Sequence, residues 1–221
     1  MNTVTLRVIA FAGMIVTVAA ATARAASCVP PPGFVDTPHP ALSADAPLVS
    51  HTEEMSFDRP LKVVVASTNR PLKDTVQRTS ALPGVAGDYA LTPGDFGAPG
   101  TRRLVCLTDG STLEEQSLER EQTDTAYHFR YVVWNYTTAK ARPIEYGLGD
   151  FKYTSDGADR SHVVWVYSFK LRDNRFPGYL GAMGRYLFRV GFLDRDYAEL
   201  MRASLGQMKT AADNEAAISS K

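Results

Sequence analysis

The chain is poor in the residues that build metal centres and hydrolytic sites. Its 221 residues include four histidines and two cysteines, and no two histidines have the spacing that would make them metal ligands on one strand or helix. A G-x-S-x-G motif is absent, and no serine, histidine and acid form a recognisable triad. We therefore expect no metal and no cofactor, and we assign no catalytic residue.

An excess of charge of either sign is also absent. The chain has 24 Lys and Arg residues and 24 Asp and Glu residues, so its net charge gives no long-range field toward polyanions. Neither nucleic acid nor acidic lipid is therefore indicated as a partner.

Long apolar runs are scarce, and the clearest one lies near the start of the chain. It spans Val8 to Ala21, follows Arg7 and precedes Ala23-Arg24-Ala25. The run is shorter than the roughly 20 residues of a membrane span, and an A-x-A sequence after such a run is typical of a secretory signal peptide. We expect residues 1–25 to be removed and the mature protein to be periplasmic, without an integral membrane segment. Lipid anchoring through Cys28 is the less favoured alternative, because the preceding residues lack the leucine of a lipobox.

The two cysteines, Cys28 and Cys106, are an even count in a chain that we expect to be exported. This favours a disulfide between them. Such a bridge closes a long loop and would contribute about 4 kcal/mol on the chain-entropy model. The alternative is a buried free Cys106 and a Cys28 without a role.

Composition divides the rest of the chain into three parts. Residues 26–47 are rich in proline and lack apolar periodicity, which is typical of an extended linker. Residues 48–213 have the size of one domain, and residues 214–221 are expected to be a flexible tail. We expect the protein to be a monomer.

Turn residues divide the domain into short alternating segments that predict an antiparallel sheet. Asp109-Gly110 is the strongest turn and predicts a hairpin. Two short helices are expected early in the domain, one opened by Asp58-Arg59-Pro60 and one from Pro71 to about Thr79. The predicted strands are Val49 to Phe57, Ala86 to Leu91, Thr101 to Thr108, Thr112 to Glu119, Thr125 to Tyr136, Ile144 to Tyr153 and Ser161 to Leu171.

The last predicted strand is followed by a helical pattern from Gly178 to Thr210. The strand places an aromatic set on one face, which must be covered. The helical segment carries apolar residues at three- and four-residue spacing, which predicts an amphipathic helix that covers that face. These apolar residues are Met183, Leu187, Val190, Leu193, Tyr197, Leu200, Met201, Leu205 and Met208.

The stretch Ser161-His-Val-Val-Trp-Val-Tyr-Ser-Phe-Lys-Leu171, with Phe192-Leu-Asp-Arg-Asp-Tyr-Ala-Glu-Leu-Met201 and Leu205-Gly-Gln-Met208, resembles the START-like, or SRPBCC, superfamily in its polyketide cyclase/dehydrase and lipid-transport branch. The resemblance is strongest over Tyr127 to Lys209. It implies an α+β helix-grip fold, in which a curved antiparallel sheet wraps around a long C-terminal helix. It also implies a cavity between sheet and helix.

Regularly spaced aromatic residues usually form a filled core, but the resemblance favours a cavity that binds a hydrophobic small molecule or lipid. The candidate pocket residues are Tyr127, Phe129, Tyr131, Val133, Val163, Trp165, Tyr167, Phe169, Tyr197 and Met201. One alternative is a cofactor-free cyclase or dehydratase that uses a pocket tyrosine, Glu145 or Asp150 as acid or base. Another is a structural or interaction module with a filled core. Gly147-Leu-Gly149 is expected to mark strand curvature rather than a phosphate loop.

Overall fold

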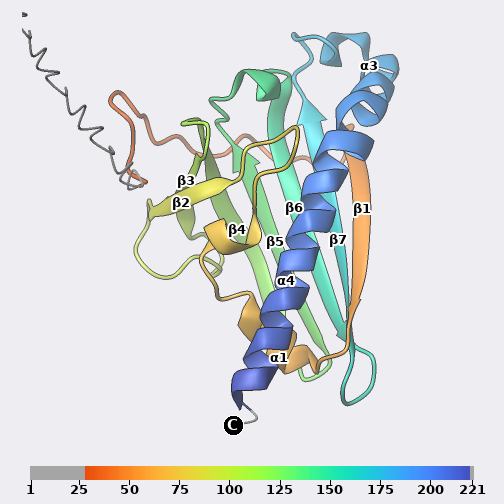
Figure 1. Cartoon of the computed structure of the whole chain (residues 1–221). Coiled ribbons are helices and arrows are strands. Elements are labelled where there is room, and N and C mark those ends of the chain that lie inside the picture. The colour runs from red at the N-terminus through yellow and green to blue at the C-terminus, as the bar shows by residue number, and fades with distance from the viewer. Residues whose placement is uncertain (1–27, 220–221) are drawn as a thin grey trace, which may run out of the picture.

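A computed structural model of the chain describes residues 28–219. The signal peptide predicted for residues 1–25 lies outside the described residues. The described chain has a seven-stranded antiparallel sheet with helices on one face and an N-terminal segment on the other (Figure 1). This is the predicted α+β helix-grip arrangement.

The sheet has the strand order β1-β7-β6-β5-β4-β3-β2, so the first strand pairs with the last. Antiparallel hairpins join β3 through β7; the β3–β4, β4–β5 and β6–β7 turns are short, whereas residues 135–143 form a longer connection between β5 and β6. The strands are β1 (Val49–Phe57), β2 (Val85–Ala90), β3 (Arg102–Leu107), β4 (Thr112–Gln122), β5 (Ala126–Trp134), β6 (Ile144–Ser155) and β7 (Ser161–Leu171).

The helices before β2 are short. Helix α1 (Leu61–Ser67) begins after Pro60 and packs against the C-terminal helix. Helix α2 (Leu72–Thr75) is a single turn, so the helix predicted to reach about Thr79 ends early. The residues that follow leave the helix and form one wall of the cavity described below.

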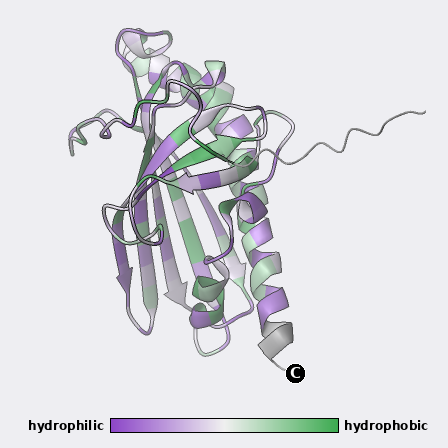
Figure 2. Ribbon diagram, turned by 90° about the vertical axis from the view of Figure 1, so that its left-hand side faces the viewer, coloured by the Kyte–Doolittle hydropathy of each residue, from purple (hydrophilic) through white to green (hydrophobic). Residues whose placement is uncertain are grey.

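The C-terminal helical region has four parts: a 3₁₀ turn (Gly178–Leu180), α3 (Ala182–Phe188), a π-helical segment (Arg189–Tyr197) and α4 (Ala198–Ser219). In Figure 2 the sheet and α4 form two layers, with α4 lying along the sheet. Helix α4 continues to Ser219, through most of the segment predicted as a flexible tail. A 3₁₀ turn (Ala139–Ala141) joins β5 to β6.

The predicted apolar stripe is wrong over α3 and the start of the π-helical segment. Met183, Leu187 and Val190 are exposed, whereas Met201 and Leu205 of α4 are buried as expected. The π-helical segment explains the difference, because its i→i+5 hydrogen bonds give more residues per turn and rotate α3 out of phase with α4. The buried face of α3 is instead formed by Phe188, whose ring packs 5.5 Å from that of Phe169.

Two glycines of β6 let tyrosine rings lie directly over the strand. A Cβ atom on Gly149 would lie 2.1 Å from the ring of Tyr131, and one on Gly147 would lie 2.7 Å from the hydroxyl oxygen of Tyr167. These glycines therefore mark a close approach of side chain to backbone.

Residues 28–48 form neither helix nor strand and lie against the outer face of the sheet. The predicted disulfide is confirmed, since Cys28 and Cys106 are joined by a 2.07 Å bond. The indole Nε1 of Trp134 donates to the Thr37 carbonyl at 3.2 Å, and Leu42 and Leu48 join the outer cluster around Trp134. The Cys28 sulfur is therefore used in the disulfide rather than being free to carry a lipid.

Candidate functional site

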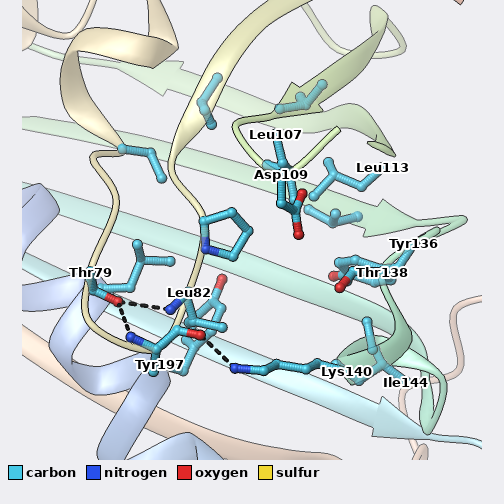
Figure 3. Close-up of a pocket in the computed structure, with 18 of the residues that line it drawn as sticks. Thr79, Leu82, Leu107, Asp109, Leu113, Tyr136, Thr138, Lys140, Ile144 and Tyr197 are labelled. Carbon is cyan, nitrogen blue, oxygen red and sulfur yellow. Dashed lines mark hydrogen bonds between the residues drawn. The ribbon is translucent and has the colours of Figure 1, made fainter. Parts of the chain in front are cut away.

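A cavity of about 400 Å³ lies between the inner face of the sheet, the loop that follows α2 and the start of α4. Figure 3 shows part of its wall, with Leu107 and Leu113 of the β3–β4 hairpin facing Tyr197 and Leu82 across the space. The volume is within the range of about 300 to 1,000 Å³ that is typical of small-molecule sites. The space between sheet and helix is therefore not filled.

Six of the ten predicted pocket residues line this cavity: Tyr131, Val133, Trp165, Tyr167, Phe169 and Tyr197. They belong to β5, β7 and the end of the π-helical segment, the elements on which the sequence placed them.

The other four, Tyr127, Phe129, Val163 and Met201, do not line it. Tyr127 packs edge-on against Tyr153 at 5.2 Å, and Phe129 stacks on Tyr131 at 5.5 Å. Val163 and Met201 are fully buried in the main core. Tyr127, Val163 and Met201 are therefore corrected from the pocket to the main core, and Phe129 to a half-buried position that packs against that core beside Tyr131 and Phe96.

Much of the cavity wall was missed in the sequence. It comes from the β3–β4 hairpin, from the loop after α2 and from the connection between β5 and β6; examples are Val105, Leu107, Leu113, Leu82 and Ile144. A signal was present for the hairpin, because Asp109-Gly110 predicts that β3 and β4 pair, and in the paired strands Val105 lies opposite Leu113. The sequence of the loop after α2 contained no such signal, since its residues show no hydrophobic periodicity.

A buried carboxylate lies in the cavity wall. Glu115 of β4 is 6% exposed and is paired with Arg103 of β3, whose Nη2 and Nε lie 2.5 and 2.6 Å from Oε2. The guanidinium of Arg103 also lies 3.7 Å above the ring of Phe96. Burial raises the pKa of Glu115, and the attraction of Arg103 opposes this only in part. The site therefore holds a carboxyl group suited to binding or transferring a proton.

Four tyrosines surround the same end of the cavity: Tyr131, Tyr136, Tyr167 and Tyr197. Burial raises the pKa of each hydroxyl above its ordinary value, so all four stay neutral near pH 7. Within residues 28–219, the Tyr136 hydroxyl and the Trp165 Nε1 are buried without a hydrogen-bond partner. The cavity is thus apolar with a polar end.

The loop after α2 is held over the cavity from two sides. Lys140 Nζ donates to the Ala81 carbonyl at 2.6 Å, a contact drawn in Figure 3. On the other side, Ser80 Oγ donates to the carboxylate of Glu199 on α4 at 3.0 Å. The loop is therefore fixed to both the sheet connection and the helix.

Glu145 and Asp150, the acids considered for an enzyme, lie on the outer face of the sheet. Asp150 Oδ1 is 3.0 Å from His128 Nε2, and Glu145 Oε2 is 4.0 Å from Lys170 Nζ. Neither borders the cavity; the acidic residues that line it are the buried Glu115 and, in the β3–β4 turn, Asp109. Residues 28–219 contain no group of three or more His, Cys, Asp or Glu arranged to hold a metal ion.

No protein-family model and no curated protein matches the chain. Solved structures do match it. An aromatase/cyclase, ZhuI from Streptomyces sp. R1128, is 12% identical with a TM-score of 0.52, over 76% of this chain and 96% of that chain. Ara h 8.0201 is 16% identical with a TM-score of 0.51, over 77% of this chain and 99% of that chain.

The chain has the START-like, helix-grip fold. Norcoclaurine synthase from Thalictrum flavum shares it, at 8% identity and a TM-score of 0.51, over 78% of this chain and 98% of that chain. At these identities the likeness shows the START-like fold alone, because one fold hosts many activities.

Proposed function

We propose that this START-like protein is an exported binding protein for a hydrophobic small molecule or lipid held between the sheet and α4. The observation that carries the proposal is the cavity of about 400 Å³, walled by aliphatic and aromatic side chains with Glu115 at one end. Burying apolar ligand surface in such a space is favourable by about 25 cal/mol per Å². The ligand has an apolar body and a polar group that reaches the tyrosine hydroxyls.

Export is supported by two separate features. The apolar leader predicted over residues 1–25 is one, and the Cys28–Cys106 disulfide, which suits an oxidising compartment, is the other. In the described part of the chain, every helix is too short or too polar to cross a membrane.

The test has two parts. Native mass spectrometry of protein purified from its own host should detect a co-purifying ligand that organic solvent releases. In addition, the neutral fluorescent probe 1-aminoanthracene should bind with one site per chain. Leu113→Phe fills part of the cavity and should weaken probe binding at least tenfold, whereas Leu118→Phe, on the outer face of the same strand, should leave it unchanged. Absence of both ligand and probe binding, or equal loss in both variants, would refute the proposal.

A second candidate function is a cofactor-free cyclase or dehydratase. It is favoured by the position of Glu115, a carboxyl group with a raised pKa in an apolar cavity and near tyrosine hydroxyls. In this case Glu115 exchanges a proton with a carbon or oxygen of the ligand. The names of two matched structures, an aromatase/cyclase and norcoclaurine synthase, agree with chemistry in such a cavity.

A further inference from the structure

Exposed apolar side chains are concentrated at one end of the molecule. Of the ten large apolar side chains that are exposed in the described residues, seven lie between residues 176 and 190. They are Phe176, Tyr179, Leu180, Met183, Tyr186, Leu187 and Val190. Single exposed apolar residues are ordinary, whereas a cluster marks an interaction surface. We call residues 176–190 the apolar end; it includes α3, at the top of Figure 1.

Helix α3 of the apolar end packs against the preceding turn and against the sheet. A Cβ atom on Gly184 would lie 1.8 Å from the Pro177 carbonyl oxygen, so α3 can rest against the preceding turn only because residue 184 is glycine. Phe188 anchors α3 from below, with its ring 5.5 Å from that of Phe169. The exposed side chains therefore belong to a packed element, and they include an i, i+3, i+4, i+7 stripe of Met183, Tyr186, Leu187 and Val190 that nothing in the described chain covers.

Arginines without acidic partners border the apolar end. Arg142, Arg172 and Arg175 line one pocket together with Asn174 and Tyr136. Within the described residues, no carboxylate lies within ion-pair distance of these three guanidinium groups; the only side-chain bond among them is from Arg172 Nε to the Ile144 carbonyl at 3.1 Å. The neighbouring acid, Asp173, is 3.0 Å from Lys170. The pocket is therefore cationic and suited to an anionic group such as a phosphate.

The balanced charge of the whole chain does not describe this end. Between Arg172 and Phe192 the sequence contains four arginines and a single acid, Asp173. Local charge decides surface contacts, because screening limits the reach of distant charges to about 10 Å. The expectation that acidic lipid is not a partner was drawn from the net charge of the whole chain, which does not reflect this local cluster of arginines.

We propose that the apolar end docks the protein on a membrane surface that contains anionic lipids. The stripe of α3 and the side chains of Phe176 and Tyr179 enter the boundary between head groups and acyl chains, and Arg142, Arg172 and Arg175 bind lipid phosphates. An amphipathic element with aromatic residues on one side and arginines beside it fits such an interface. Charge complementarity favours a lipid surface over a second copy of the chain, since two copies would bring the unpaired arginines together.

Sedimentation with vesicles tests this proposal. The purified protein should bind vesicles of phosphatidylcholine and phosphatidylglycerol, and should bind pure phosphatidylcholine at least tenfold more weakly. Each arginine near an anionic surface adds about a fivefold gain in partitioning, so Arg172→Gln/Arg175→Gln should lower binding at least tenfold. Met183→Ser/Leu187→Ser should lower it by a similar factor.

Matched controls are available at other exposed positions. Arg160→Gln changes an arginine in the β6–β7 turn, at the opposite end of the sheet (Figure 1), and Tyr89→Ser removes an exposed aromatic side chain from β2. Both should bind vesicles within twofold of the unchanged protein. Because Arg172 also donates to the Ile144 carbonyl, its replacement could destabilise the fold. Arg142→Gln is therefore a second variant, which should weaken vesicle binding without changing the melting temperature. Equal binding to neutral and anionic vesicles, no binding to either, or a dimer that Met183→Ser/Leu187→Ser abolishes would each overturn the proposal.

Discussion

The two faces of the β3–β4 hairpin carry the same kind of ion pair in different surroundings. Glu114 and Glu115 are adjacent on β4 and both are buried, but they point to opposite faces of the sheet. Each pairs with one of two adjacent arginines of β3, Arg102 on the outer face and Arg103 on the inner face.

On the outer face the Glu114 carboxylate is enclosed by protein. Glu114 is 0% exposed and accepts hydrogen bonds from Arg102 and from the Asn135 amide, both at 2.6 Å. Arg102 also pairs with Asp36 and donates to the Thr37 carbonyl at 2.7 Å. Both carboxylate oxygens of Glu114 are thus partnered, and the segment before β1 is fixed to the sheet.

On the inner face the corresponding pair borders empty space. Glu115 has Arg103 as its partner, and it otherwise faces the cavity at the end where the tyrosine hydroxyls lie. On the outer face, the Arg102–Glu114 pair therefore attaches the segment before β1, because Asp36 and the Thr37 carbonyl also contact Arg102. On the inner face, the Arg103–Glu115 pair leaves a carboxyl group for a ligand to meet.

The largest effect is expected from breaking the outer network. Arg102→Ala leaves the Glu114 carboxylate buried without its cation, and loss of one partner of a buried pair typically costs about 3 to 5 kcal/mol of unfolding free energy. Arg103→Ala should cost less, about 1 to 3 kcal/mol, because water entering the cavity can solvate Glu115. Urea unfolding of the two variants measures the difference. Equal losses would show that the two faces are energetically alike.

A somewhat smaller effect is expected from the disulfide, which holds the outer segment at its start. Replacing both Cys28 and Cys106 with Ser removes a bridge across 78 residues and should lower the free energy of unfolding by about 2 to 4 kcal/mol. Limited proteolysis should then cut within residues 29–47. Reduction of the unchanged protein is the control and should reproduce both results; an unchanged unfolding curve would contradict the prediction.

Local rules were sufficient to predict the sheet. The last strand has the predicted bounds, Ser161–Leu171, because the Asp156-Gly157 turn precedes it and strict alternation continues to Leu171. Alternation along β5 also places the pocket candidates Tyr131 and Val133 on one face; both lie in the main core, while the adjacent Trp134 points into the outer cluster. Side-chain alternation has a period of two, so a correct strand boundary fixes the face of each residue as far as the next β-bulge; β4 and β6 each contain one.

Two kinds of feature could not be predicted from alternation and turn residues: a change of helix type within the C-terminal region, and contacts between strands. The π-helical segment changes the phase of the C-terminal helix and exposes Met183 and Leu187, which a constant period of 3.6 places in the core. Glu115 was missed because a charged residue in a short strand suggests solvent, unless its partner on the neighbouring strand is known. The prediction that Glu145 or Asp150 could act as acid or base in the cavity was wrong, because the sequence did not show which face of the sheet these β6 residues occupy.

The smallest effect concerns the inner carboxyl group itself. Glu115→Gln should change the free energy of unfolding near pH 7 by about 1 kcal/mol or less, because Gln avoids burying a charge and Arg103 keeps the ring of Phe96. The informative quantity is the pH dependence of the difference between the two proteins. Since burial raises the pKa of Glu115 in the folded chain, the stability that its neutral form contributes is complete below the pKa of the unfolded chain, about 4.3, and is lost as pH rises through the folded pKa.

Unfolding free energies measured from about pH 4 to pH 7 should therefore shift in favour of Glu115→Gln as pH rises. Titrations of Glu114 and other groups occur in both proteins and cancel in the difference. A shift in favour of the unchanged protein would mean that attraction to Arg103 outweighs burial. Glu115 would then remain an ionised member of a structural pair, and its suitability as a proton donor or acceptor in the cavity would be lost.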